Sequence, residues 1–272
     1  MSAETYAAAY QGQPGAYSEE AAWALVGRDA RLLPCETLPV LFEAVRSGQA
    51  QHGVLPVENS LAGTVPRAYE LLLDHDLNAI AETCVRIDHV LVGQRATRFA
   101  DVRRVLSHPV ALDQCTRFLH DGAFERVPVF DTAGAVAMIM SDDARDVAAI
   151  ASRRAAAHHD AAILAEHIQD HDENWTRFLL LAPERGARAE QGRKAIVSFH
   201  LRHDCGTLSR ALDRLSGHGL NLTKIESRPL HGRPFEYAFV IEVVCGDIPP
   251  AWSRWLDDFR PLTTDVRLLG VY

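Results

Sequence analysis

The stretch "KAIVSFHLRHDCGTLSRALDRLSGHGLNLTKIES" (194–227) carries the pattern that decides the fold of the C-terminal part of the chain. It opens with mostly apolar and β-branched residues, which predict a short strand. Leu208, Leu212 and Leu215 then recur at i, i+4 and i+7, and they predict one apolar face of a helix over 206–219 that ends in glycines. A second alternating run closes the stretch and predicts another strand.

Three further elements follow this second strand, which is predicted over 220–227. Residues 235–244 alternate like a strand, residues 250–260 form a helix opened by proline, and residues 265–272 form a last strand. The predicted order is therefore β-α-β-β-α-β, a ferredoxin-like domain over 194–272.

The first 182 residues show a different pattern, in which short apolar strands alternate with alanine-rich helices. Strands are predicted near residues 6–10, 31–33, 53–57, 88–92, 103–106, 126–130, 147–151 and 177–182. Helices are predicted near residues 18–27, 38–47, 64–74, 110–120, 132–141 and 152–158. This alternation predicts an α/β domain over 1–182 with a parallel sheet, whose ligands bind at the carboxyl ends of strands. The stretch "PERGARAEQGR" (183–193) has no apolar periodicity and is the predicted linker.

Composition restricts the classes of partner. The 272 residues are 47% apolar and 24% charged, as in an ordinary globular protein with two or three packed units. A net charge of -8 argues against a nucleic-acid partner, although a local cluster can still bind a small anion. Lysine occurs only at 194 and 224, so nearly all of the positive charge is arginine, which suits carboxylates.

Cysteine usage and the N-terminal sequence bear on location. Five widely spaced cysteines without a CxxC pair indicate reduced thiols in a cytosolic protein. The start "MSAETYAAAY" (1–10) has no basic segment and is not a secretory signal. Because no apolar run approaches 18 uncharged residues, we expect a cytoplasmic protein without a membrane partner.

Polar residues follow several of the predicted strands, where ligands are expected. They are Ser18, Glu58, Asn59, Ser60, Thr64, Ser107, Gln114, Asp131, Thr132 and Ser152. Four helix N-termini also follow strands and offer free N–H groups to an anion. Taken singly, Ser107, Asp131 and Ser152 are better explained as simple helix caps than as ligand contacts, and Ser18 is an expected cap. The run Glu58-Asn59-Ser60 fits either a turn or a ligand site.

The stretch "HDENWTRFLLL" (171–181) places Asn174, Thr176 and Arg177 at the entrance of an apolar strand. These side chains either solvate the end of the strand or face a ligand. Phe178 is expected in the core.

Metal and thiol chemistry have little support in the sequence. His158, His159, His167 and His171 lie close together, and the last two could share a helical face, but no HExxH motif accompanies them. No GxSxG motif occurs, and Cys115 has no suggestive partner. The sequence therefore predicts a site of hydroxyls, amides and helix ends, which binds an anion and moves a proton without a metal, a phosphate loop or a thiolate.

Seven ordered blocks resemble the prephenate dehydratases. The blocks are "GQPGAYSEEAA", "LPVENSLAGTV", "LSHPVALDQC", "DTAGAVA", "AAIAS", "ILAEHIQD" and "NWTRFLLL". The C-terminal part resembles an ACT regulatory domain, with "GTLSRAL" and "NLTKIESRP" where those enzymes bind phenylalanine. The resemblance covers nearly the whole chain and implies the monofunctional form, because no chorismate mutase segment precedes Tyr6.

The resemblance implies a two-lobed catalytic part similar to periplasmic binding proteins, without a cofactor. Its reaction removes carbon dioxide and water from prephenate to give phenylpyruvate. Thr176 is the implied donor to the leaving hydroxyl, a role worth roughly 10²- to 10⁴-fold in rate. Asn59, Ser107 and Gln114 are implied to line the cleft, with Glu58 beside them. Further substrate contacts are expected at Ser60, Thr64, Thr132 and Arg177, although Arg177 fits a structural anchor slightly better.

The resemblance also implies a site for L-phenylalanine as effector. Its expected residues are Gly206, Thr207, Leu208, Asn221, Leu222, Glu226 and Ser227. Cys205 replaces the usual proline of the family, so the strength and sign of regulation stay open. In the catalytic part, Val110 replaces a usual glutamine and is expected to pack.

Two other functions remain open from the sequence. An arogenate dehydratase would perform the same chemistry on the amino analogue of prephenate. A non-catalytic amino-acid or solute-binding protein would share the fold and the cleft, although Thr176 argues against it. By resemblance, we also expect a homodimer or a homotetramer.

Overall fold

The computed structural model describes most of the chain. The described residues are 5–142, 144–183, 192–202, 204–230, 232, 236–246 and 251–272. They divide into two compact units, Met1–Val65 with Thr83–Phe178 and Pro66–Glu82 with Leu179–Tyr272. Residues 184–191 of the predicted linker (183–193) lie outside the described residues. This division moves 66–82 to the C-terminal unit, and the assignment of 1–182 to catalysis and 194–272 to regulation stays a prediction.

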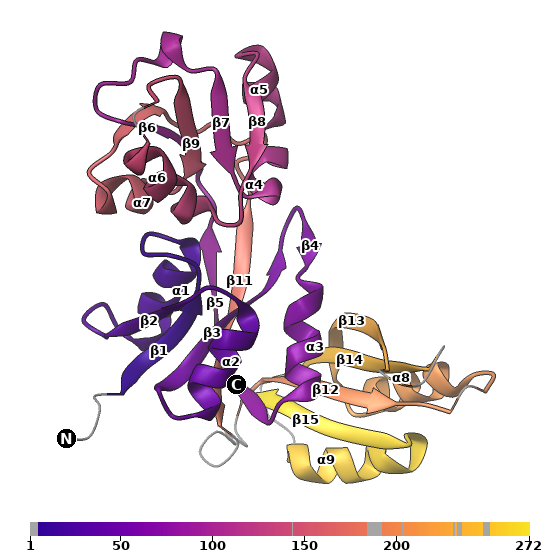
Figure 1. The fold of residues 1–272 in the computed structure, drawn as a ribbon. Coiled ribbons are helices and arrows are strands. Elements are labelled where there is room, and N and C mark those ends of the chain that lie inside the picture. Colours follow the sequence, from indigo (N-terminus) through magenta and orange to yellow (C-terminus); the bar gives the residue numbers. More distant parts are fainter. Residues whose placement is uncertain are drawn as a thin grey trace. The chain divides into compact units, whose positions relative to one another are not determined.

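The first lobe of the first unit is a parallel β-sheet covered by two helices (Figure 1). Its strands β1 (Tyr6–Gln11), β2 (Leu32–Cys35) and β3 (Ala50–Asn59) lie in the order β2-β1-β3 and are parallel. Helices α1 (Tyr17–Val26) and α2 (Leu38–Arg46) pack against β1 and β3. Thr37 is the N-cap of α2, and its side chain accepts a hydrogen bond from Val40 N. These elements confirm the predicted strand–helix alternation in this lobe.

Two more strands meet β3. The short β4 (Gly63–Thr64) pairs with its end, and β11 (Trp175–Pro183) is its neighbour in the sheet. The strand β5 (Leu77–Arg86), which we did not predict, and β11 each cross from one compact unit into the other along the chain. The end of β3 and the start of β11 therefore come together although they lie more than 100 residues apart.

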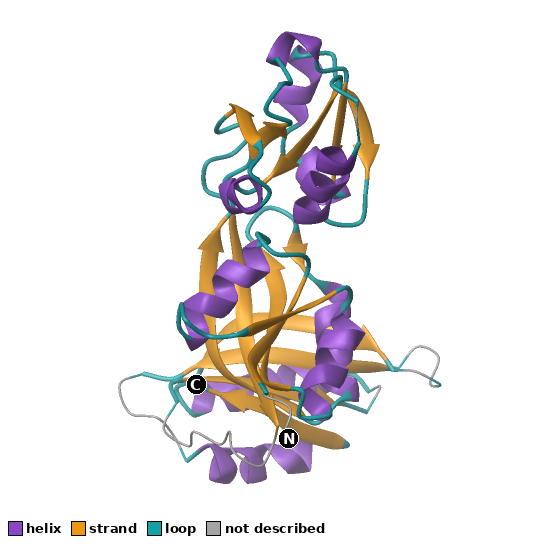
Figure 2. Cartoon of the chain, turned by 60° about the vertical axis from the view of Figure 1, so that its left-hand side comes forward, coloured by secondary structure: helices purple, strands orange, loops and turns teal. Residues whose placement is uncertain are grey.

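The second lobe contains a five-stranded sheet with helices beside it (Figure 2). Its strands, in the order β10-β6-β9-β7-β8, are β10 (Ala162–Ala165), β6 (Val90–Gly93), β9 (Val147–Ala151), β7 (Arg104–Ser107) and β8 (Glu125–Pro128). The strand β7 is parallel to β8 and β9, as predicted. The expectation of a parallel sheet is wrong for β6, which runs antiparallel to β9 and to the unpredicted β10. β6 thus lies as an antiparallel strand between β9 and β10, which are joined along the chain through α7.

The helices of this lobe are α4 (Pro109–Asp113), α5 (Thr116–Asp121), α6 (Thr132–Ser141) and α7 (Arg153–His158). One continuous helix over 110–120 was expected, but the chain breaks it at Gln114 and Cys115. The break leaves the Gln114 side chain at the C-terminal end of α4 instead of on a helical face.

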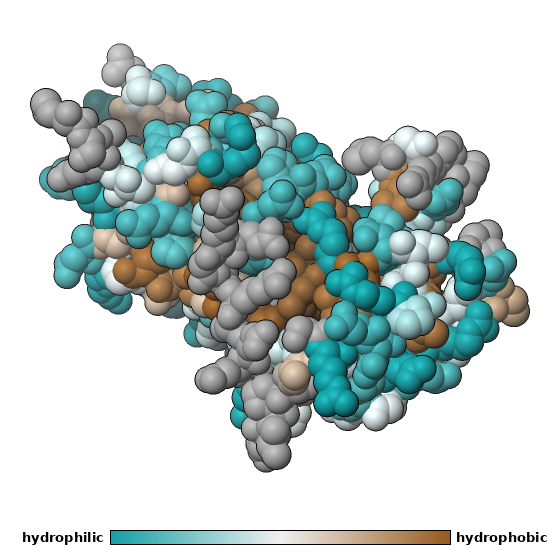
Figure 3. Space-filling view, turned by 90° about the horizontal axis from the view of Figure 1, so that it is seen from below, coloured by the Kyte–Doolittle hydropathy of each residue, from teal (hydrophilic) through white to brown (hydrophobic). Residues whose placement is uncertain are grey.

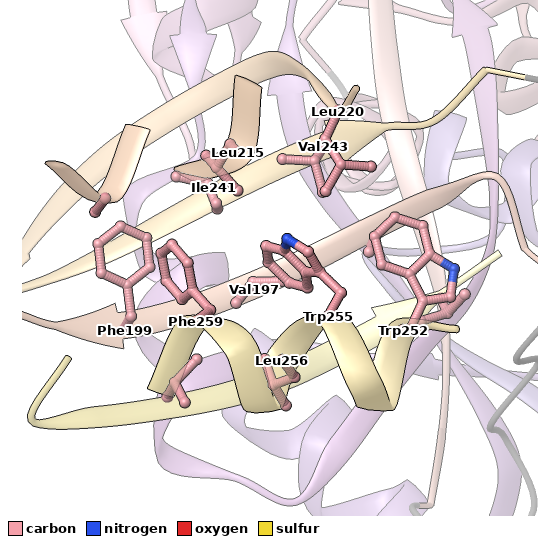
Figure 4. Close-up of a cluster of buried hydrophobic side chains, with 14 of the residues drawn as sticks. Val197, Phe199, Leu215, Leu220, Ile241, Val243, Trp252, Trp255, Leu256 and Phe259 are labelled. Carbon is pink, nitrogen blue, oxygen red and sulfur yellow. The ribbon is translucent and has the colours of Figure 1, made fainter. Parts of the chain in front are cut away.

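The C-terminal part of the second unit has the predicted ferredoxin-like topology. Its elements are β12 (Lys194–His200), α8 (Thr207–Gly217), β13 (Asn221–Pro229), β14 (Tyr237–Val244), α9 (Trp252–Phe259) and β15 (Asp265–Val271). The strands pair antiparallel in the order β13-β14-β12-β15. Side chains from the sheet and both helices form its core, including Phe199, Leu215, Trp255 and Phe259 (Figure 4). The leucine stripe of 206–219 is thus the apolar face that α8 buries.

A buried group of charged side chains also lies in the second unit. The Glu242 carboxylate is 1% exposed and accepts a hydrogen bond from the Tyr69 hydroxyl at 2.8 Å. Lys194 Nζ lies 3.1 Å from Glu242 and 2.8 Å from Glu82. Tyr69 belongs to α3 (Pro66–Asp74), so these contacts fix α3 and β5 to the C-terminal strands.

The surface seen in Figure 3 is largely hydrophilic, with hydrophobic residues in patches between the polar ones. Among the described residues, no helix is long and apolar enough to cross a membrane.

Candidate functional site

The turn after β3 is joined to the entrance of β11. The backbone N–H of Ser60 donates to the carbonyl of Trp175 at 2.8 Å. The Ser60 hydroxyl accepts from Trp175 N at 2.9 Å and donates to the Glu173 carbonyl at 3.2 Å. Ser60, an expected substrate contact, thus fastens two segments together. The polar residues at both strand ends are therefore neighbours.

Asn59 is the centre of this junction and is only 9% exposed. Its Oδ1 accepts hydrogen bonds from the backbone N–H groups of Leu61 at 3.0 Å and Ala62 at 2.8 Å. Its Nδ2 donates to the Trp175 carbonyl at 3.1 Å. Since backbone N–H groups only donate and a carbonyl only accepts, these partners fix which end of the amide is oxygen and which is nitrogen.

The orientation of Asn59 determines what the Thr176 hydroxyl can do. Asn59 Nδ2 lies 3.0 Å from Thr176 Oγ1 and also 2.7 Å from Asn174 Oδ1. Because Nδ2 cannot accept, Thr176 Oγ1 is the acceptor in this contact, where the two Nδ2 protons are shared among three oxygens, and the proton of Thr176 is not used in it. Thr176 is half-buried. The resulting site is a neutral O–H donor backed by an amide donor.

Gln114 and His89 extend the network into the second lobe. Gln114 Nε2 lies 3.4 Å from Asn59 Oδ1, and Gln114 Oε1 lies 2.9 Å from His89 Nε2. His89 is 2% exposed, and burial lowers the pKa of its imidazole, so the ring is neutral near pH 7. The sequence analysis missed His89. The one sequence feature that could have pointed to His89 is its place as a polar residue directly before the apolar run "VLVG".

Glu58 and Arg177 form an ion pair beside this network. Arg177 Nη2 lies 2.9 Å from Glu58 Oε2, and the Arg177 side chain is 14% exposed. This contact occupies one oxygen of Glu58, and both roles expected for Arg177 remain predictions.

Ser107 is in a different environment from the one expected. It is 0% exposed, and its hydroxyl donates to the Ile150 carbonyl at 2.7 Å. The expectation that Ser107 caps the next helix is wrong, because His108 Nδ1 accepts the capping bond from Val110 N at 3.2 Å. A proline at the first helical position moves the cap to His108.

The other expected caps gave mixed results. Asp131 and Ser152 cap α6 and α7, accepting from Gly134 N at 2.9 Å and Ala155 N at 3.0 Å. Ser18 is not a cap, because α1 begins after Ala16, which makes no side-chain capping bond.

Two further residues were expected to contact the substrate. Thr64 is on β4 opposite Glu58, and Thr132 is the first residue of α6. Among the described residues, no hydrogen bond links the Thr132 side chain to the network.

A pocket of about 460 Å³ lies between the lobes, next to the start of α6. One wall is apolar and includes Phe130 and Met138, which are 66% and 49% exposed. Gln13 and Asp131 close it, since Gln13 N donates to Asp131 Oδ2 at 3.2 Å. We did not foresee this apolar wall.

The expected effector residues lie at the start of α8 and along β13. Gly206 precedes α8 with a left-handed backbone (φ +76°), and Thr207 Oγ1 donates to the Arg202 carbonyl at 3.0 Å. Leu208 packs against the C-terminal core. On β13, Asn221 and Ser227 are exposed, Leu222 is half-buried, and Glu226 lies 3.2 Å from Arg228 Nη2.

The described residues contain no group of three or more His, Cys, Asp or Glu side chains arranged to hold a metal ion. The helical face suggested for His167 and His171 is wrong, because residues 166–174 are not helical.

The fold is that of an α/β protein with two sheets, and a cluster of neutral donors joins the end of β3 to the start of β11. The family model for prephenate dehydratase matches residues 8–186, and the chain belongs to this family.

The chain is similar to proteins named as dehydratases and to one that is described as an acylase. The chain is 37% identical over 278 residues to arogenate dehydratase/prephenate dehydratase 1, chloroplastic, from Arabidopsis thaliana, covering 97% of this chain and 71% of that protein. It is 30% identical to prephenate dehydratase from Arthrobacter aurescens in complex with L-Phe, with a TM-score of 0.86 and coverage of 97% and 89%. It is 33% identical to GqqA, described as a novel type of quorum quenching acylase, with a TM-score of 0.87 and coverage of 97% and 96%.

Proposed function

We propose that this chain converts prephenate to phenylpyruvate, and that Thr176 donates a hydrogen bond to the leaving hydroxyl. The observation that carries this proposal is the 3.0 Å contact from Asn59 Nδ2 to Thr176 Oγ1, which leaves the threonine proton for the substrate. The family membership supports a dehydratase reaction.

In the proposed reaction, the bond between the ring and its carboxylate breaks, and carbon dioxide leaves. The electron pair moves into the ring as the carbon–oxygen bond to the hydroxyl breaks. The departing oxygen takes up one proton and leaves as water, and the ring becomes aromatic. A threonine hydroxyl is a weak acid, so Thr176 acts as a hydrogen-bond donor within the network, and solvent supplies the net proton.

The neutral character of the network suits a substrate with two carboxylates. Amide and hydroxyl dipoles that are already oriented stabilise the charge on the departing oxygen without adding a negative charge beside the substrate. A single donor of this kind contributes about 3 kcal/mol to lowering the barrier. The charge of Glu58 is offset by Arg177 at 2.9 Å.

Arogenate is the second candidate substrate, because relatives from Arabidopsis thaliana and Petunia hybrida are named arogenate dehydratases. Arogenate carries an ammonium group where prephenate has a ketone, and the reacting ring is the same. The choice between them therefore depends on side-chain contacts away from Thr176.

We further propose that the C-terminal β-α-β-β-α-β domain is an ACT domain that binds L-phenylalanine near Gly206 and Ser227. The L-Phe complex of the Arthrobacter aurescens enzyme supports this proposal. A dimer or tetramer in the cytoplasm remains our expectation for the working form.

The test is turnover by the purified protein with prephenate and with arogenate in parallel. The proposal predicts formation of phenylpyruvate from prephenate at a higher kcat/KM than formation of phenylalanine from arogenate. The opposite ranking would assign the chain to arogenate. If the protein hydrolyses an N-acyl amide and dehydrates neither prephenate nor arogenate, the proposal is overturned in favour of an acylase. If it binds a ligand without any turnover, a binding protein is favoured.

A further inference from the structure

The polarity of the hydrogen-bond network can be followed beyond Asn59. Its Oδ1 faces the backbone N–H groups of Leu61 and Ala62, so the Gln114 atom next to it, at 3.4 Å, is the amide nitrogen. The other end of that amide, Gln114 Oε1, then faces His89 Nε2 at 2.9 Å. A carbonyl oxygen only accepts, so His89 Nε2 carries a proton and donates.

Tyr17 contacts the other ring nitrogen of His89. Tyr17 Oη lies 2.6 Å from the Asp88 carbonyl and 3.3 Å from His89 Nδ1, so its single proton faces two acceptors when Nδ1 is unprotonated. The two rings meet edge to face, with centroids 5.8 Å apart. His89 N also donates to Gln169 Oε1 at 3.1 Å. Both the ring and the backbone of His89 are therefore held in place.

We propose that His89 is a positioning residue whose Nε2–H holds the Gln114 amide with its nitrogen toward Asn59, and thereby keeps the Thr176 hydroxyl directed at the substrate. The inference rests on the proposed function for its effect on turnover. The tautomer itself is a property of the resting protein and does not depend on any substrate. Without the His89 donor, the Gln114 amide can rotate and turn its oxygen toward Asn59 Oδ1, and these two oxygens repel each other.

The first experiment reads the tautomer directly. We would record the ¹⁵N chemical shifts of the imidazole of His89 in the wild-type protein near pH 7.5, without ligand, and assign them with the His89→Gln variant. The inference predicts a protonated Nε2 and an unprotonated Nδ1. A protonated Nδ1 with a bare Nε2 would overturn it, whether or not the protein turns over prephenate.

The second experiment uses two amide replacements that differ in where they place a donor. In His89→Gln the side-chain nitrogen reaches the position of Nε2, whereas in His89→Asn it reaches the position of Nδ1. We expect His89→Gln to keep kcat within about threefold of wild type, and His89→Asn to lower kcat by about tenfold with little change in KM. Equal losses in the two variants at equal thermal stability would contradict the inference. His52→Gln, at a half-buried histidine that contacts the Ala7 carbonyl at 3.1 Å, is the control.

The third experiment tests whether His89 acts through Gln114. If it does, His89→Asn combined with Gln114→Ala should be no slower than Gln114→Ala alone, because the shared contact is lost once. If the fold-losses in kcat of the two single variants multiply in the double variant, His89 acts by a route that does not involve Gln114. Absence of turnover in the wild type with both prephenate and arogenate would count against the proposed function. The tautomer measurement would still decide the orientation of the network.

Discussion

The two compact units each bury a polar network, and the two networks differ in charge. In the first unit, Asn59, Gln114 and Thr176 are neutral, and each bond has a defined donor and acceptor. In the second unit, the Glu242 carboxylate is almost fully buried against Lys194, with the Tyr69 hydroxyl as a further partner. A neutral network orients protons without repelling an anionic substrate. An ion pair holds segments together but depends less on the direction of its contacts. We therefore assign chemistry to the first network and structural support to the second.

Glu242→Ala should give the largest loss of stability. It removes the most buried partner of Lys194 and leaves Glu82 and the aromatic ring of Tyr272 near its ammonium group. We expect the free energy of unfolding to fall by about 3 kcal/mol, measured by urea denaturation. Glu242→Gln keeps an acceptor for Tyr69 and should cost less. Arg46→Ala, which breaks an exposed pair with Glu43, should cost about 0.5 kcal/mol or less. If Glu242→Ala costs no more than Arg46→Ala, the ion pair does not hold the second unit together.

Asn59→Ala should act on both activity and stability. The change leaves the Leu61 and Ala62 N–H groups without their acceptor and removes the donor to Thr176. We expect kcat/KM to fall at least tenfold and stability to fall by about 2 kcal/mol. Asn59→Asp keeps the acceptor and loses the donor, so it separates the two effects. If Asn59→Asp kept full activity, the amide donor to Thr176 would not matter.

Acid should weaken the first network in a defined direction. Burial lowers the pKa of His89 in the folded protein below its value in the unfolded chain, so below about pH 6.5 the unfolded state takes up a proton that the folded state resists. The stability contributed by neutral His89 is therefore present above this pH and is lost as the pH falls. The His89→Gln variant should lose less stability than wild type between pH 7 and pH 5, measured by thermal unfolding in matched buffers. Equal losses would show that other groups dominate the acid response.

Ser227→Ala should have the smallest effect on basal turnover. Ser227 is exposed on β13, so the change removes a proposed effector contact without disturbing the core. We expect the response to L-phenylalanine to be blunted, with kcat in its absence unchanged. Measurement of turnover over a range of L-phenylalanine concentrations checks this. If turnover by Ser227→Ala responds to L-phenylalanine as fully as wild type does, the effector binds outside the 226–229 segment. Ser216→Ala, at an exposed residue of α8, is the matched control.

The sequence was sufficient for local features and insufficient for contacts between distant segments. The leucine stripe of α8 and the caps Asp131 and Ser152 depend on neighbours within a few residues, and they were predicted correctly. The bonds from Asn59 to Gln114 and Thr176 join residues separated by 55 and 117 positions. Their geometry could not be predicted, because it is set by the pairing of β3 with β11 and by the break after α4.

Ser107 and His89 show the same limit at single residues. A serine before His-Pro fits a helix cap by pattern, yet its hydroxyl is used by the Ile150 carbonyl of a strand 43 residues away. His89 sits in a short apolar run and gives no periodic signal, and it becomes meaningful only once Gln114 is placed beside it. In both cases the partner is supplied by the tertiary fold.

The most direct test of the central claim compares Thr176→Ala with Thr176→Ser under single-turnover conditions with prephenate. Thr176→Ser keeps the hydroxyl that Asn59 Nδ2 contacts, whereas Thr176→Ala removes it. The account predicts that Thr176→Ala slows the chemical step by about 10²- to 10³-fold with substrate binding retained, and that Thr176→Ser stays within about tenfold of wild type. A Thr176→Ala variant that turns over prephenate as fast as wild type would contradict the claim that this hydroxyl drives the departure of water.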